Sequence, residues 1–240
     1  MAGGAGRRVL KLARFFSPLM HTGRSLKMTG APNSIDAADR LSKVLVSLLP
    51  AGAIGGIQQI ESGNEGMLTA SELAVMPGAV IGRRRASGSA RAVARRLLHG
   101  AGCPGIDILR SASGAPVWPA GFIGSLAHDN VMAAAAIARS DELGGIGIDV
   151  EAPEPLEDGV IGLVATRLEQ QRFCRHPIDG KLLFSVKEAI FKAVNPTDRV
   201  FLNFDEVMVD RKAKTAETCY GRLVHWRAAA RPRIVAIAWW

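Results

Sequence analysis

The sequence predicts a mixed α+β fold, because both halves of the chain combine a long helical pattern with short strand patterns. In the first half, apolar side chains recur at helical spacing over residues 34–48, and a basic helical pattern covers residues 83–98. In the second half, the strongest helical pattern spans residues 181–194. Apolar runs without helical spacing indicate strands at residues 131–138, 145–151, 200–210 and 222–240.

Local signals place the ends of the elements in the first half. Ser34 is a suitable N-cap for the first helix, and Pro50 ends it. Residues 51–60 indicate a loop and a strand, and Thr69 or Ser71 begins the next helix.

Later in the chain, residues 106–109 indicate a short strand, and residues 111–124 form a turn-rich loop. One helix is expected over residues 160–174, after an acidic, proline-rich loop and before Pro177. A basic turn at residues 211–214 separates the last two strand patterns.

The charge of the chain is concentrated at its N-terminus. The 240 residues include 30 basic and 22 acidic side chains, giving a formal net charge of +8. Six of the basic residues and none of the acidic ones lie within residues 1–35. The rest of the chain therefore has 24 basic and 22 acidic side chains. A nearly neutral body argues against a broad nucleic-acid-binding face. Residues 1–33 have the composition of a transit-type leader, but a disordered tail or a misplaced start codon would have the same composition, and we favour one of these two.

Cysteine usage and hydropathy indicate a cytoplasmic protein. Cys103, Cys174 and Cys219 are widely spaced, which suggests neither a disulfide framework nor a cysteine zinc site and fits a reducing compartment. Proline and glycine interrupt the longest uncharged runs, so no membrane span is expected.

Asp149 and Glu151 are the first candidate site residues. On a strand, Ile146, Ile148 and Val150 share one face and the two acids share the other. Two carboxylates at i and i+2 stand roughly 7 Å apart at Cα, so their oxygens can converge on one hard cation such as Mg²⁺. The alternative is a strand end with two solvated acids.

Three further patterns point to anionic ligands, and each has a plain structural alternative. The arginines of residues 83–98, including Arg91 and Arg95 on one face, form either a phosphate cradle or a solvated helix surface. His128 stands at the edge of a strand pattern. It is either a ligand-binding residue or an ordinary surface or hydrogen-bonded histidine. Glu188 and Lys192 lie one helical turn apart, as a site pair or as a surface ion pair.

The ordered set of these motifs resembles the 4'-phosphopantetheinyl transferase superfamily, closest to the surfactin-type branch that includes the enterobactin-synthetase component D proteins. The resemblance covers about residues 36–215. Four segments carry it, and the last two are the most specific: Gly114–Pro119, Gly124–His128, Gly147–Glu151 and Phe184–Ala193.

The resemblance implies a role for each matched residue. Asp149, Glu151 and Glu188 would hold a catalytic Mg²⁺, and Glu188, directly or through a metal-bound water, would act as the base. Lys192 would stabilise the departing phosphate. The phosphates of coenzyme A would be bound by Ser125, His128, Arg83, Arg91 and Lys187.

The match is imperfect at two places. The family's Glu-Phe pair within the arginine helix is replaced by Ala86 and Ser87, which leaves the register of Arg83 less certain than that of Arg91. The hydroxyl residue that usually precedes the histidine is Ala127.

The fold implied by the resemblance has two similar lobes related by a pseudo-twofold axis, each a small, mostly antiparallel sheet packed on a long helix. The lobes would comprise residues 34–140 and 141–240, with the active site in the cleft between them. Members of this branch typically act as monomers.

The implied reaction transfers phosphopantetheine from coenzyme A to a serine of an apo acyl or peptidyl carrier protein and releases 3',5'-ADP. Siderophore, polyketide or nonribosomal peptide synthesis would use the product. Two alternatives are another Mg²⁺-dependent phosphotransferase or phosphohydrolase, and a basic binding module with a degenerate site. The first lacks a visible Gly-rich phosphate loop, and the second leaves the acid cluster unexplained.

Overall fold

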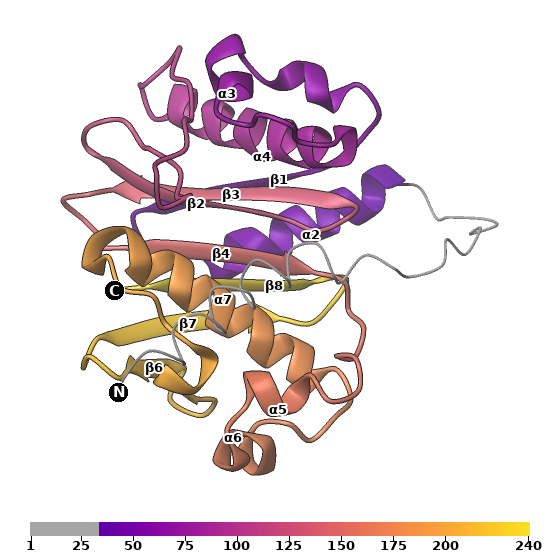
Figure 1. Cartoon of the computed structure of the whole chain (residues 1–240), viewed down its shortest axis with the longest axis vertical. Helices are drawn as coiled ribbons and strands as arrows, with labels where there is room; N and C mark the ends of the chain where they lie inside the picture. Colours follow the sequence, from indigo (N-terminus) through magenta and orange to yellow (C-terminus); the bar gives the residue numbers. More distant parts are fainter. Residues whose placement is uncertain (1–33) are drawn as a thin grey trace. The chain divides into compact units, whose positions relative to one another are not determined.

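The computed structural model describes residues 34–240, with side chains from residue 38 onward, so the predicted tail over residues 1–33 lies outside the described part. Two antiparallel sheets organise this part of the chain, which confirms the predicted α+β class (Figure 1). The first sheet has the strand order β1 (Ala53–Gln59), β3 (Met132–Arg139), β2 (Phe122–His128). The second has the order β4 (Ile146–Glu151), β8 (Ile234–Trp239), β7 (Leu223–Ala229), β6 (Thr215–Thr218), β5 (Val207–Asp210).

Each sheet is covered by one long helix. In the first sheet, α4 (Ile81–Gly100) packs on β3 and β1, and its Val93 and Leu98 share a buried cluster with Ile137. In the second sheet, α7 (Asp179–Asp198) packs on β4 and β8. This arrangement agrees with the two-lobed fold (Figure 1).

The helix α2 (Ser34–Leu48) contributes to a core shared by both sheets. Its Leu41, Leu45 and Leu48 recur at helical spacing and are buried. The same cluster contains apolar side chains of β2, β3, β4 and β8, among them Ala134, Ile148 and Ile237. Apolar packing therefore ties the two sheets together on this side.

The strand β4 alternates as predicted. Ile146, Ile148 and Val150 belong to the core shared with α2, and Asp149 and Glu151 therefore point to the opposite face, where α7 packs. Their backbone register on β8 pairs Asp149 with Ala236 and Glu151 with Ile234.

Gly147 allows α7 to lie directly on β4. A Cβ atom at this position would stand 1.9 Å from the carbonyl oxygen of Ala189 and 2.7 Å from the backbone nitrogen of Ala193. No side chain fits in that space, so glycine sets the distance between the strand with the acids and the helix with Glu188 and Lys192.

Several predicted elements differ from the structure. Residues 106–109 form no ladder, and the adjoining Arg110 makes only an isolated bridge to Pro116. The helix expected over 160–174 is two short helices, α5 (Ile161–Val164) and α6 (Arg167–Arg172). Thr166 starts the second one, because it forms a capping box with Glu169.

The C-terminal strands also differ from the predicted ones. Only residues 207–210 of the 200–210 pattern are a strand, and the 222–240 pattern is a hairpin of β7 and β8. The strand β6 was not expected at all. The short helix α3 (Ala70–Ala74) begins after Thr69, one of its two predicted starts. Among the described residues, no helix combines the length and hydropathy needed to cross a bilayer.

Candidate active site

The contact between β4 and α7 brings the predicted acids and Lys192 together. Lys192 Nζ lies 2.7 Å from Asp149 Oδ1 and 3.2 Å from the carbonyl oxygen of Ile148, and it donates a hydrogen bond to each. Glu188 lies one helical turn before Lys192, on the same face of α7. The surface ion pair considered for Glu188 and Lys192 is therefore replaced by a cross-element pair between Lys192 and Asp149.

One oxygen of Asp149 has no partner. Its Oδ2 is buried and accepts no hydrogen bond within the described residues. A buried carboxylate oxygen without a donor is unfavourable unless a cation or a proton reaches it. This oxygen is therefore available to a ligand that the protein itself does not supply.

The environment disfavours charge on the other two acids. Burial raises the pKa of Glu188 to about 7; the charge of Asp149 adds to the rise, and Lys192 opposes it. Burial likewise raises the pKa of Glu151 to about 7, with Asp149 adding to the rise and Lys181 opposing it. Asp149 thus acts as a like charge on both Glu188 and Glu151, and a divalent cation would relieve this repulsion.

The donor set fits Mg²⁺ in chemistry, since it offers carboxylate oxygens from a strand and a helix. As the side chains stand, however, no three His, Cys, Asp or Glu residues of the described chain surround a single point. Two of the three acids are instead paired with ammonium groups, Asp149 with Lys192 and Glu151 with Lys181.

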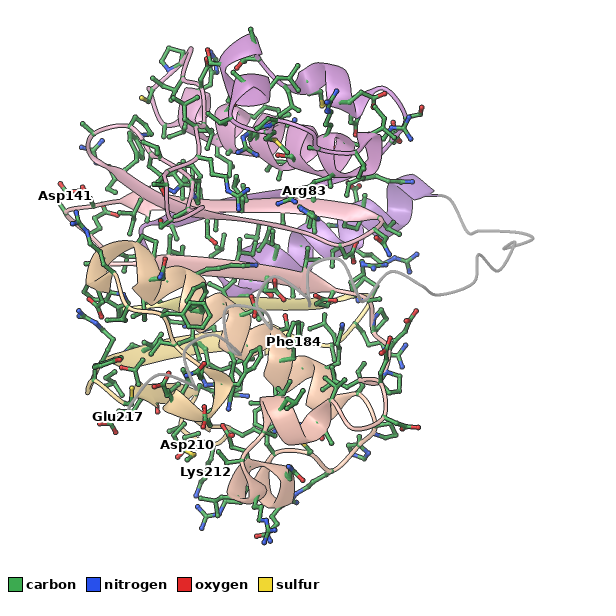
Figure 2. The ribbon with its side chains drawn as sticks, viewed as in Figure 1. Arg83, Asp141, Phe184, Asp210, Lys212 and Glu217 are labelled. Atoms are coloured by element: carbon green, nitrogen blue, oxygen red, sulfur yellow. The ribbon has the colours of Figure 1, made fainter. Side chains whose placement is uncertain are left out.

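Lys181, which the sequence analysis does not single out, is paired with one of the candidate site acids. Its Nζ lies 2.9 Å from Glu151 Oε2, and its side chain is 5% exposed. The ammonium also stands 5.2 Å from the centroid of the Phe184 ring, which lies on the same helix (Figure 2). A usable signal existed, because Lys181 precedes Glu188 by seven residues, or two helical turns.

Lys187 does not belong to an anion-binding cluster, contrary to the prediction. Its side chain is 1% exposed, and Nζ donates to the carbonyl oxygens of Val164 and Phe204 and to Glu169 Oε2 at 2.6–3.0 Å. All three ammonium protons are therefore used inside the protein. Burial lowers the pKa of Lys187, and Glu169 opposes that shift.

Arg91 is likewise a buried residue. Its Nε donates to the carbonyl oxygen of Ile108 at 2.8 Å, and its Nη1 donates to Ser87 Oγ. Burial lowers the pKa of Arg91, the charge of Glu72 opposes this, and the nearby charge of Arg110 adds to it. In this structure Nε and Nη1 of Arg91 are used inside the protein, and the predicted contact of Arg91 with a coenzyme A phosphate stays a prediction.

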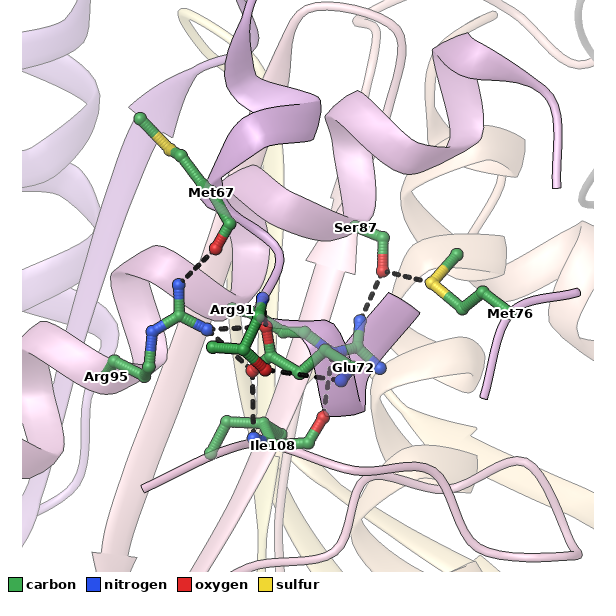
Figure 3. A network of polar contacts seen from close by, with 8 residues as sticks. Met67, Glu72, Met76, Ser87, Arg91, Arg95 and Ile108 are labelled. Carbon is green, nitrogen blue, oxygen red and sulfur yellow. Dashed lines mark hydrogen bonds and ion pairs between the residues drawn. The ribbon is translucent and has the colours of Figure 1, made fainter. Parts of the chain in front are cut away.

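Figure 3 shows the network that holds Arg91. Glu72, which is completely buried, accepts hydrogen bonds from Arg95 at 2.6 Å and from the backbone nitrogen of Ile108 at 2.9 Å. Residue 108 is thus held through its C=O by Arg91 of α4 and through its N–H by Glu72 of α3, just before the loop that leads to β2. Arg83, near the start of α4, is exposed (Figure 2).

Ser125 and His128 do not share a face of β2. Ser125 is buried and lies on the same side as Ala127, whereas His128 is exposed at the end of the strand. Of the two side chains, only that of His128 is exposed, and the predicted role of Ser125 in coenzyme A binding stays a prediction.

Two grooves on the described surface lie away from these residues. One, of about 790 Å³, is lined by α6 and the β5–β6 turn, and the other, of about 650 Å³, lies beside Arg96 and His99 of α4. Neither is lined by Asp149, Glu151, Glu188 or His128. The cleft between the lobes stays a prediction.

Comparison with known proteins matches both lobes. Residues 71–138 match the model of a 4'-phosphopantetheinyl transferase N-terminal domain, and residues 145–238 match that of the 4'-phosphopantetheinyl transferase superfamily. The chain is 34% identical to 4'-phosphopantetheinyl transferase Svp of Streptomyces mobaraensis over 182 residues, covering 72% of this chain and 74% of the relative.

Two further relatives carry the same description. 4'-Phosphopantetheinyl transferase Npt of Nocardia iowensis is 33% identical over 171 residues, covering 69% of this chain and 76% of Npt. 4'-Phosphopantetheinyl transferase PptT of Mycobacterium tuberculosis is 31% identical over 173 residues, with the same two shares.

Proposed function

Because the chain belongs to the 4'-phosphopantetheinyl transferase superfamily, we propose that it transfers the phosphopantetheine arm of coenzyme A to a serine of an apo acyl or peptidyl carrier protein. The observation that carries this proposal is the joining of Asp149, Glu188 and Lys192 where α7 packs on β4. The arrangement combines carboxylate oxygens with an ammonium group. Transfer of a phosphorylated group depends on such charged groups, because they position and neutralise the phosphate oxygens.

We propose that Asp149, Glu151 and Glu188 hold Mg²⁺ together with the pyrophosphate of coenzyme A. The unpartnered Asp149 Oδ2 and the raised pKa values of Glu151 and Glu188 support this assignment. When bound, the ion would act as a Lewis acid and would neutralise charge on the phosphate oxygens.

The protein's own groups then account for the proton transfer. The serine Oγ attacks the pantetheine-side phosphorus, its proton passes to Glu188, and the P–O bond to 3',5'-ADP breaks. Glu188 is the candidate base because it is a carboxylate that lies one helical turn from Lys192 and beside the Asp149 strand. Lys192 stabilises the charge that develops on the leaving phosphate.

For coenzyme A binding we propose two accessible residues, Arg83 on α4 and His128 at the end of β2. Arg91 supports this region from inside, through Ile108. We further propose that the lobes comprise residues 34–140 and 141–240, that the enzyme is a cytoplasmic monomer of the surfactin-type branch, and that its carriers serve siderophore, polyketide or nonribosomal peptide synthesis.

The experiment is intact-mass spectrometry of apo carrier proteins incubated with the enzyme, coenzyme A and Mg²⁺. A mass gain of one phosphopantetheine arm that disappears with EDTA is expected. Absence of any gain across acyl and peptidyl carriers would contradict the proposal.

A further inference from the structure

An ion pair joins the two sheets next to the candidate site. Arg233 donates from Nε to Asp129 Oδ2 at 2.7 Å, and its Nη2 donates to the same oxygen. The two side chains are 104 residues apart in sequence and only 19% and 8% exposed. Such a charge-assisted pair restricts both the distance between the two side chains and their orientation.

The position of Asp129 gives this pair its significance. Asp129 directly follows His128, and its other oxygen, Oδ1, accepts hydrogen bonds from the backbone nitrogens of Val131 and Met132, each at 2.7 Å. One carboxylate therefore shapes the β2–β3 turn with one oxygen and reaches the other sheet with the second.

Arg233 is placed in a corresponding way. It immediately precedes Ile234, which lies opposite Glu151 in the β4–β8 register. The pair thus links Asp129, which is next to His128, to Arg233, which is next to the residue that pairs with Glu151. The charge of Asp129 adds a small contribution to the raised pKa of Glu151, behind burial and the charge of Asp149.

Backbone hydrogen bonds do not fix this spacing. Within the described residues, β2 and β4 belong to different sheets with no ladder between them. The shared core around Leu41 and Leu45 holds the sheets together by apolar packing, which is non-directional. The Asp129–Arg233 pair adds a directional contact at the site end, where it can set the relative position of the two strands.

We infer that Asp129 and Arg233 are positioning residues that set the distance between His128, the proposed coenzyme A ligand, and the Asp149–Glu151 strand end. The inference rests on the proposed function. A misplacement of about 1 Å can reduce the rate of a reaction by about a hundredfold. If the pair is lost, His128 also moves relative to the strand end, so coenzyme A binding weakens together with the transfer rate.

The test compares coenzyme A binding by calorimetry, with and without Mg²⁺, in the wild type, Asp129→Asn and Arg233→Gln. Asparagine keeps an oxygen for the turn but loses the charge that holds Arg233. Arg222→Gln is the matched control, because Arg222 makes a similar forked pair with Asp198, at 2.9 Å from Nε, within the second sheet's lobe.

Both test variants are expected to weaken coenzyme A binding about tenfold to a hundredfold, which is the loss expected for one hydrogen bond to a charged group. Arg222→Gln is expected to lower only the melting temperature. Arg233→Lys, which keeps the charge, should recover part of the affinity. Unchanged affinity in Arg233→Gln would overturn the inference while leaving the transferase assignment intact. A wild type that binds no coenzyme A would overturn both. If Asp129→Asn does not fold, Arg233→Gln carries the test.

Discussion

Lys192 and Asp149 form a partly buried ion pair, 2.7 Å between Nζ and Oδ1, across the contact of α7 with β4. The two residues are 43 positions apart, and each comes from a different motif. The pair leaves Asp149 Oδ2 without a partner and lies one helical turn from Glu188. We therefore assign the carboxylate of Asp149 to the proposed metal ion and the ammonium group of Lys192 to the phosphate.

The first prediction concerns the pH dependence of stability. The pKa of Glu188 rises from 4.5 to about 7 on folding, so the folded state keeps a proton that the unfolded chain loses. Below pH 4.5, Glu188 has no effect on the free energy of unfolding. Between pH 4.5 and 7 it lowers that free energy progressively, and above pH 7 the loss is constant. Because Glu188 is partly exposed, the penalty is about 1–3 kcal/mol.

Glu188→Gln should therefore raise the free energy of unfolding of the metal-free protein at pH 8 and leave it nearly unchanged at pH 4.5. Urea unfolding in EDTA at the two pH values measures this. An equal effect at both would show that ionisation of Glu188 is not the cause.

The second prediction separates two neighbouring lysines. Lys187→Met leaves Glu169 buried without its cation and should lower the free energy of unfolding by about 3–5 kcal/mol. Lys192→Ala, at a position that is 27% exposed, should have a smaller effect on stability and a larger one on the transfer rate. Denaturant unfolding and single-turnover kinetics on both variants check the contrast, and a stable, slow Lys187→Met would reverse our correction.

The third prediction tests the packing of α7 on β4. Gly147→Ala places a methyl group against the backbone of Ala189 and Ala193, so helix and strand must separate. We expect a loss of about 1–3 kcal/mol in stability and a fall in transfer rate, because Lys192 moves away from Asp149.

The control for this packing is Gly162→Ala, where no heavy atom lies within 4 Å of the added Cβ. It should leave both stability and rate near wild type. A fully active, stable Gly147→Ala would mean that the helix position is not critical.

The fourth prediction concerns magnesium. Metal binding needs deprotonated carboxylates, so Mg²⁺ should raise the melting temperature more at pH 8 than at pH 6, given that Glu151 and Glu188 have pKa values of about 7. Asp149→Asn should abolish most of this shift. Differential scanning calorimetry provides the measurement, and the same magnesium effect in Asp149→Asn would remove that residue from the ligand set.

Much of the site could be predicted from local periodicity. Strand alternation predicts that Asp149 and Glu151 lie on the opposite face of the strand from Ile148, and the structure has the same arrangement. Helical periodicity could also have excluded Lys187, because it lies four residues after Leu183 and three before Ile190, on the buried stripe. The resemblance to the family outweighed that signal.

Other features depend on tertiary contacts that no local pattern encodes. Arg91 looked like a free guanidinium on a basic helix, but Ile108 and Ser87 bury it. Asp129 and Arg233 meet only because the β2–β3 turn lies against the β7–β8 turn. The break at Thr166 was readable as a capping box with Glu169, yet the apolar pattern around it favoured one longer helix.

The most direct test of the account is the single-turnover rate of phosphopantetheine transfer by Glu188→Gln, at saturating coenzyme A and Mg²⁺, relative to the wild type. Glutamine keeps the size of the side chain but cannot accept the serine proton and is a poorer ligand for the ion. The account predicts a folded protein that still binds coenzyme A and transfers at least about a hundredfold more slowly. A variant that transfers at the wild-type rate would contradict it.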